Sequence, residues 1–179
     1  MAGNQIQIHS FTLKANGVQR MLPIKLEITG LNDRTKLCST IGIWDTGATS
    51  SVITQEVADK LGLIPSGRTT VNTASETGHV TDTYLVDIYL KNDLRIQGVE
   101  VTVGTIDTIN GFDCLIGMDI ITLGDFSITN YKGETCMSFR IPSIHEIDYI
   151  KTPNLNVMTM RQPTGGSNYT PPHKKRKKR

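Results

Sequence analysis

The sequence predicts an all-β domain with one or two short helices. Most of the chain up to about residue 143 consists of short runs in which apolar and polar residues alternate, and a period of two is typical of half-buried strands. Clusters of Gly, Asn and Asp separate these runs, as expected for turns between strands. Only two short segments break the alternation in a way that predicts helix.

Five runs alternate clearly enough to be assigned as strands. In the first, apolar residues at 24, 26 and 28 alternate with polar ones, and the second ends at Asp45. Leu37, Ser39, Ile41 and Ile43 share one face of that second run. The other three runs have an apolar residue at every second position: Val86, Ile88 and Leu90; Val99, Val101 and Val103; Met137, Phe139 and Ile141. We expect turns at residues 30–33, 91–93 and 131–133.

The two breaks in the alternation predict short helices. The first covers residues 54–61, with Thr54 as N-cap, Gly62 just past the end and apolar residues four apart. The second covers residues 118–123. Neither is long enough to change the predicted class.

Composition excludes several kinds of protein. The chain has 179 residues and a mass of 19.7 kDa, and no apolar run approaches the roughly 18 residues of a membrane span. The first residues show no secretory signal pattern, so we expect a cytoplasmic protein. The three cysteines and four histidines lack the spacing of metal ligands. We therefore expect reduced thiols on strands, no metal site and no cofactor.

Changes in composition along the sequence divide the chain into three parts. Residues 1–143 form the predicted domain, residues 144–162 a C-terminal extension whose apolar residues we expect to be ordered against a partner, and residues 163–179 a disordered basic tail. The last six residues are all basic; without them Lys+Arg falls from 19 to 13 against 17 acids, a net charge of −4. A charge run on an acidic body predicts no nucleic-acid function, and nuclear import is the alternative role for this tail.

An aspartate at the end of an apolar strand is the main functional candidate. Asp45 follows Trp44 and precedes Thr46, Gly47 and Ala48. Asp-x-Gly alone is a common turn, in which the aspartate only caps the loop between two strands. A loop of small residues, however, also lets a carboxylate approach another group closely.

The stretch Trp-Asp-Thr-Gly-Ala-Thr-Ser at residues 44–50 closely resembles the active-site loop of retroviral and retroviral-like aspartic proteases, the retropepsins. Asp-Cys-Leu-Ile-Gly-Met-Asp-Ile-Ile at residues 113–121 resembles the second family motif, an apolar-apolar-Gly strand and helix that pack behind the catalytic loop. The resemblance covers roughly residues 20–141 and is closer to bacterial retropepsin-like proteins than to the well-known retroviral enzymes.

The resemblance implies a single-lobe acid-protease fold, a short β-barrel that is closed or partly open. It implies that Asp45 is the catalytic carboxylate, that Thr46, Gly47 and Ala48 form the active-site loop, and that Gly117 lets its strand lie close to that loop. The hydroxyl of Thr46 would bond across to a second loop.

The sequence has no other Asp-Thr-Gly or Asp-Ser-Gly, so a complete site needs a second copy of the chain. Asp113, Asp119 and Asp125 lack the loop chemistry and are interpreted as surface or cap acids. The family's shared terminal sheet makes residues 5–13 and the apolar positions between 144 and 157 candidates for the dimer interface.

In the family a β-hairpin flap closes over the substrate, and residues 71–80 are its expected counterpart here. Five residues of this flap are candidate substrate contacts: Ala74, Ser75, Glu76, Thr77 and Gly78. Glu76 and His79 could face either substrate or solvent. The prediction is thus a homodimeric aspartic endopeptidase acting on a peptide or polyprotein. The alternative is a catalytically silent module of the same fold for dimerisation or peptide binding.

Overall fold

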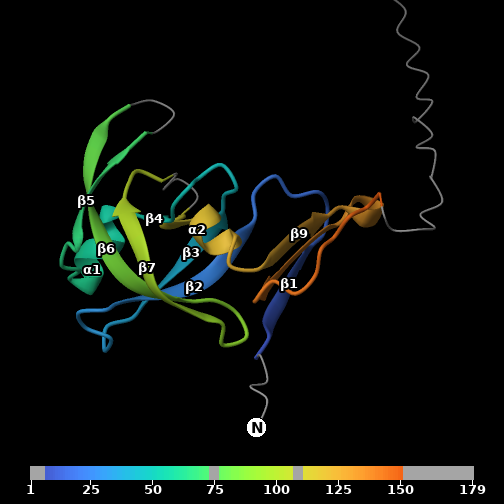
Figure 1. Cartoon of the computed structure of the whole chain (residues 1–179), viewed down its shortest axis with the longest axis horizontal. Helices are drawn as coiled ribbons and strands as arrows, with labels where there is room; N and C mark the ends of the chain where they lie inside the picture. Colours follow the sequence, from blue (N-terminus) through green and yellow to red (C-terminus); the bar gives the residue numbers. More distant parts are fainter. Residues whose placement is uncertain (1–6, 73–76, 107–110, 151–179) are drawn as a thin grey trace, which may run out of the picture. The chain divides into compact units, whose positions relative to one another are not determined.

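The computed structural model describes residues 7–72, 77–106 and 111–150 (Figure 1). The chain divides into two units, residues 1–145 and residues 146–179. Of the second unit only residues 146–150 are described, and they include a turn in which the Ile150 N–H donates to Asp148 Oδ1 at 2.9 Å. All elements below belong to the first unit.

Six strands of the first unit form a closed barrel. Neighbouring strands follow the order β2 (Pro23–Gly30), β3 (Cys38–Trp44), β8 (Cys114–Ile116), β4 (Val52–Ile53), β7 (Arg95–Val103) and β6 (His79–Tyr89). Strand β2 also pairs with β6, which closes the ring. Strand β5 (Gly67–Val71) pairs with the first half of β6 outside the ring. The prediction of an all-β domain with a short barrel, closed or partly open, is confirmed, and the barrel is closed.

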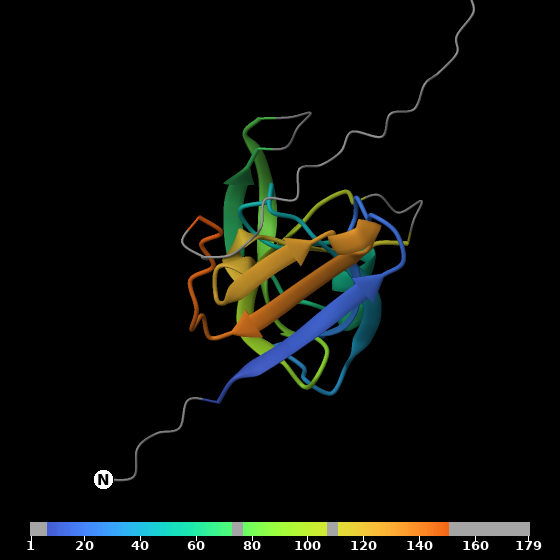
Figure 2. The same cartoon turned by 90° about the vertical axis from the view of Figure 1, so that its right-hand side faces the viewer.

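A second, three-stranded antiparallel sheet lies beside the barrel, in the order β1 (His9–Ala15), β10 (Thr135–Ile141) and β9 (Asp125–Thr129) (Figure 2). Strand β9 was not predicted from the sequence. Within the candidate interface segment 5–13, residues 9–13 pair with β10 of the same chain. Of the second candidate segment, residues 151–157 lie outside the described residues.

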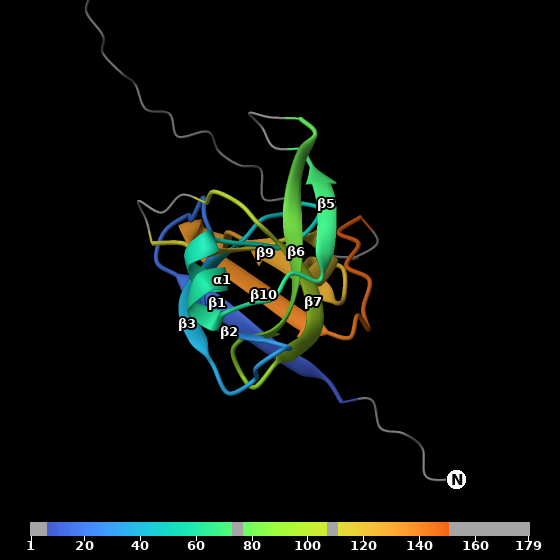
Figure 3. The same cartoon turned by 90° about the vertical axis from the view of Figure 1, so that its left-hand side faces the viewer.

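Both predicted helices are present. Helix α1 (Gln55–Leu61) lies against the barrel near β3 (Figure 3). The Thr54 side chain accepts the Val57 N–H, and Gly62 ends the helix at φ +61°, a left-handed conformation that favours glycine. Helix α2 (Met118–Ile121) follows β8 directly and is shorter than predicted. A 3-10 turn, η2 (Tyr131–Gly133), joins β9 to β10.

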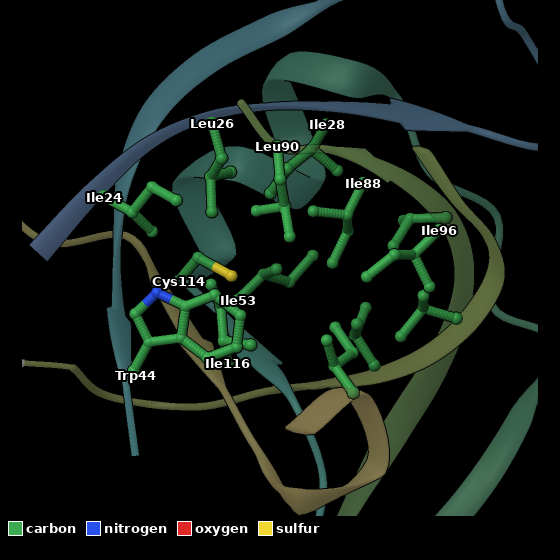
Figure 4. Packing of buried hydrophobic residues seen from close by; sticks show 14 of the residues in the cluster. Ile24, Leu26, Ile28, Trp44, Ile53, Ile88, Leu90, Ile96, Cys114 and Ile116 are labelled. Atoms are coloured by element: carbon green, nitrogen blue, oxygen red, sulfur yellow. The ribbon is translucent and has the colours of Figure 1, made fainter. Parts of the chain in front are cut away.

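Apolar side chains from all sides of the barrel meet in one core (Figure 4). The alternating residues of β2, β6 and β10 point inward as the pattern predicts. In β3 the buried face is the one opposite to Ile41 and Ile43, and Leu37 just before the strand is 49% exposed. Gly42 allows this: a Cβ atom there would lie 2.6 Å from Leu26 Cδ2. The missing side chain lets β2 fill the space.

A buried carboxylate links β6 to β7. Asp87 has a fully buried side chain and accepts hydrogen bonds from Arg34 Nε at 3.1 Å, Arg95 Nη2 at 2.5 Å and the Gly98 N–H at 2.9 Å. Burial alone would raise the pKa of Asp87, but the bonds from Arg95, Gly98 and Arg34 outweigh it and lower that pKa. The charge is therefore compensated inside the fold.

No helix in the described residues is long and apolar enough to cross a membrane. The three cysteines are free and lie on β3, β8 and β10. Burial raises the pKa of the Cys114 thiol to about 12, which makes it a poor nucleophile. The same described ranges contain no cluster of three or more His, Cys, Asp or Glu side chains able to hold a metal ion.

Candidate active site

The strand order of the barrel builds the loop that carries Asp45. Strand β8 lies between β3 and β4, parallel to the first (Trp44 opposite Ile116) and antiparallel to the second (Val52 opposite Leu115). The chain therefore leaves β3, crosses the C-terminal end of β8 and returns along β4. Residues 45–51 form this crossing, which we call the active-site loop.

Asp45 is the first residue of the active-site loop and is tied to the strand beneath it. Its N–H donates to the Ile116 carbonyl at 2.9 Å, and its own carbonyl accepts the Ala48 N–H at 3.3 Å. Its Oδ1 atom accepts the Gly47 N–H at 2.8 Å. The side chain is half-buried, and its Oδ2 atom has no hydrogen-bond partner within the described part of the chain. One carboxylate oxygen is thus fixed and the other is available.

The remaining loop residues are small and accessible. Thr46 and Gly47 are exposed, and Ala48 is half-buried. Among the residues that the structure describes, the Thr46 hydroxyl has no hydrogen-bond partner. The loop therefore presents a carboxylate oxygen and a hydroxyl, with little side-chain bulk around them.

Gly117 is where the loop rests on β8. A Cβ atom at this position would lie 2.6 Å from the Ser50 carbonyl carbon and 2.7 Å from its oxygen. Directly after Gly117, the Met118 N–H donates to the Ala48 carbonyl at 2.8 Å and the Asp119 N–H to the Thr49 carbonyl at 3.2 Å. The first amides of a helix have no partner within the helix, so α2 uses them to hold the loop.

Ser51 and Asp119 also take part in this support, a role that was not predicted from the sequence. Asp119 lies in the first turn of α2, as expected of a cap acid, but it is half-buried and accepts hydrogen bonds from Ser51. The only available sequence signal was an acid two residues after the glycine of the second motif.

An aromatic cluster holds the end of β3 in place. Trp44, next to Asp45, is 6% exposed, and its ring centroid lies 4.9 Å from that of Phe139, 5.3 Å from Phe126 and 6.3 Å from Phe11. These three phenylalanines come from β10, β9 and β1. The three-stranded sheet therefore packs against the residue that precedes the candidate catalytic carboxylate.

The predicted flap lies in the hairpin of β5 and β6, which extends beyond the barrel (Figure 1). Arg68 and Asp82 form an ion pair across its two strands at 2.8 Å. Near its tip, the Gly78 N–H donates to Asn72 Oδ1 at 2.9 Å, and Thr77 and Gly78 are exposed. The candidate contacts Ala74, Ser75 and Glu76 lie outside the described residues.

Residues 40–122 match the family described as "gag-polyprotein putative aspartyl protease". This match contains the active-site loop, the flap hairpin, β8 and all of α2. No curated protein sequence matches the chain.

Solved structures of related type are similar at low identity. A retropepsin-like aspartic protease from Rickettsia conorii is 16% identical over 76% of this chain and 98% of that one, with a TM-score of 0.49. The simian foamy virus (mac) protease is 17% identical over 56% of this chain and 91% of that one, with a TM-score of 0.40. A foamy viral protease–reverse transcriptase is 22% identical over 56% of this chain, with a TM-score of 0.41. The match spans only 11% of that longer chain.

Proposed function

The chain belongs to the retropepsin-like aspartic protease family, and on that premise we propose that it is an aspartic endopeptidase, active as a homodimer in which each chain contributes Asp45. The placement of Asp45 carries the proposal. Its carboxylate lies at the end of a buried strand, with one oxygen held by the Gly47 N–H and the other free of partners in the described residues.

Peptide hydrolysis by this route needs two carboxylates. At a separation of about 3 Å both cannot ionise, so they share one proton. One then takes a proton from a water molecule held between them, and the other donates to the oxygen of the scissile carbonyl. The small residues of the active-site loop favour this close approach, because they leave room for a second loop beside Asp45.

The second carboxylate comes from a second chain. The sequence has one Asp-Thr-Gly, and a two-fold axis through the site would place two copies of Asp45 face to face. The exposed Thr46 hydroxyl supports this arrangement, since it is available to bond across to the partner loop. The β5–β6 hairpin would then cover an extended peptide or polyprotein segment, with Thr77 and Gly78 near its tip.

Asp45→Asn tests the chemistry directly. We expect peptide-library cleavage to fall by at least 10²- to 10⁴-fold, the usual contribution of a positioned acid or base, while the variant remains a folded dimer. Wild-type activity should follow a bell-shaped pH profile with an acidic optimum that belongs to the pair of carboxylates. Asp59→Asn, a charge change on the outer side of α1, is the matched control and should retain activity. Full cleavage by Asp45→Asn would refute the mechanism.

Dilution and mixing test the dimer. Specific activity should fall as the protein is diluted through its dimer dissociation constant. With a ninefold excess of Asp45→Asn chains, random pairing leaves only about a tenth of wild-type chains with an intact partner, so activity should fall about tenfold. A monomer with undiminished turnover in analytical ultracentrifugation would overturn the assembly. A stable wild-type dimer without cleavage would favour the catalytically silent module.

A further inference from the structure

Two residues far apart in the sequence meet behind the active-site loop. Ser51, which is fully buried, donates from its N–H to Asp119 Oδ2 at 3.0 Å and from its hydroxyl to Asp119 Oδ1 at 2.9 Å. The same Oδ1 atom accepts the Ile120 N–H at 3.0 Å. Within the described part of the chain, the two oxygens of the Asp119 side chain therefore accept three hydrogen bonds.

Ser51 also forms hydrogen bonds with the strands around the site. Its hydroxyl oxygen accepts the Gly117 N–H at 3.1 Å, and its carbonyl accepts the Thr102 N–H of β7 at 3.3 Å. Ser51 is also the last residue of the loop that begins at Asp45. The end of the loop farthest from the catalytic carboxylate is thus bound to α2, β8 and β7 at one buried point.

We propose that Asp119 is a positioning residue of the active site, which holds the active-site loop in its reactive geometry by binding Ser51. This inference rests on the proposed peptidase function. Asp119 contacts no reacting atom; it acts through Ser51 and the amides of residues 117–119. The three donors around its two oxygens make a carboxylate necessary, because an amide of the same size would turn an NH₂ group toward the Ser51 or Ile120 N–H.

Asp119→Asn tests the proposal kinetically. We expect the active-site loop to shift by less than about 1 Å when it loses part of its support. A misplacement of about 1 Å can lower the reaction rate by about 100-fold. We expect kcat to fall roughly 10- to 100-fold with KM within about threefold, because chemistry rather than substrate binding depends on the loop. Asp113→Asn is the matched control. It removes the same charge just before β8, where Asp113 accepts only the Thr40 hydroxyl among described side chains, at 2.6 Å.

A double-mutant cycle tests whether Asp119 acts through Ser51. Ser51→Ala removes one of the two Ser51–Asp119 bonds and the acceptor for the Gly117 N–H, so it should lower kcat to a similar extent. Combined with Asp119→Asn it should add little, because residues that act as a unit are strongly non-additive. Ser51→Thr keeps the hydroxyl and should restore most of the rate. Fully additive losses would overturn the proposal, and Ser51→Ala carries the test if Asp119→Asn does not fold.

Hydrogen exchange separates this proposal from the proposed function. In Asp119→Asn the amides of Ser51, Gly117 and Met118 should exchange at least about tenfold faster, through local opening. The Gly98 amide, bound to Asp87 elsewhere in the barrel, should be unchanged. If exchange at the amides of Ser51, Gly117 and Met118 is unaltered in Asp119→Asn, the proposed role of Asp119 is overturned. An unaltered kcat of this variant, in an enzyme that is active, would overturn it as well. A wild-type chain that cleaves no peptide refutes only the peptidase function, and exchange still decides the role of Asp119.

Discussion

Replacing Gly117 by alanine tests how closely the active-site loop rests on β8. The added Cβ would lie 2.6 Å from the Ser50 carbonyl carbon and 2.7 Å from its oxygen, two backbone atoms, and 3.0 Å from Asp119 Oδ1. Since favourable carbon contacts begin at about 3.5 Å, the loop has to move by about 0.9 Å. A side chain could rotate away from such a clash, but a backbone tied down at Ala48, Thr49 and Ser51 cannot.

That displacement predicts both a kinetic and a thermodynamic effect. Misplacing a catalytic group by about 1 Å costs on the order of 100-fold in rate, so kcat/KM for peptide cleavage should fall by about that factor. Overpacking of this kind costs about 1–3 kcal/mol of unfolding free energy. Steady-state cleavage of one library-derived peptide and urea unfolding of the same preparations measure the two effects.

Gly30→Ala is the matched control for this substitution. Its added Cβ would meet Asn32 Oδ1 at 2.5 Å and Leu63 Cδ2 at 2.6 Å, both at the ends of flexible side chains. These ends can rotate away, and Gly30 lies at the end of β2, outside the active-site loop, so cleavage should stay within about twofold of wild type. Wild-type cleavage and stability in Gly117→Ala would refute the contact between loop and strand that the structure places there.

Three further predictions concern the rest of the chain. Asp87→Ala should lower the unfolding free energy by about 2–4 kcal/mol. This loss is smaller than that expected on breaking a fully buried ion pair, because Arg34 and Arg95 are both partly exposed. Since the folded-state pKa of Asp87 is lowered, this difference should be full above about pH 4 and shrink as the pH falls below it; a difference independent of pH would contradict the ion-pair account. Phe139→Ala, at 0% exposure beside Trp44, should cost about 3–5 kcal/mol in urea unfolding, and a loss under 1 kcal/mol would exclude the packing described. Deleting residues 163–179 should leave peptide cleavage near wild type, whereas a large loss would make the basic tail part of the enzyme.

Local patterns were enough to predict much of this protein. Alternation assigned the central strands because a half-buried strand needs an apolar residue at every second position. The start and end of helix α1 could also be predicted, because Thr54 and Gly62 form hydrogen bonds with backbone groups only a few residues away. The candidate carboxylate was identified from its own neighbours in sequence, residues 44–50, and from a second motif.

Other features depend on pairings between distant segments, and only the tertiary structure decided them. The buried face of β3 was set by Gly42, which makes room for Leu26 of another strand. The insertion of β8 between β3 and β4 creates the crossing loop, and the pairing of β2 with β6 closes the barrel. Ser51 and Asp119, 68 positions apart, bind each other because that insertion brings α2 beneath the loop. Alternation and capping act over a few residues, so they carry no information about contacts of this range.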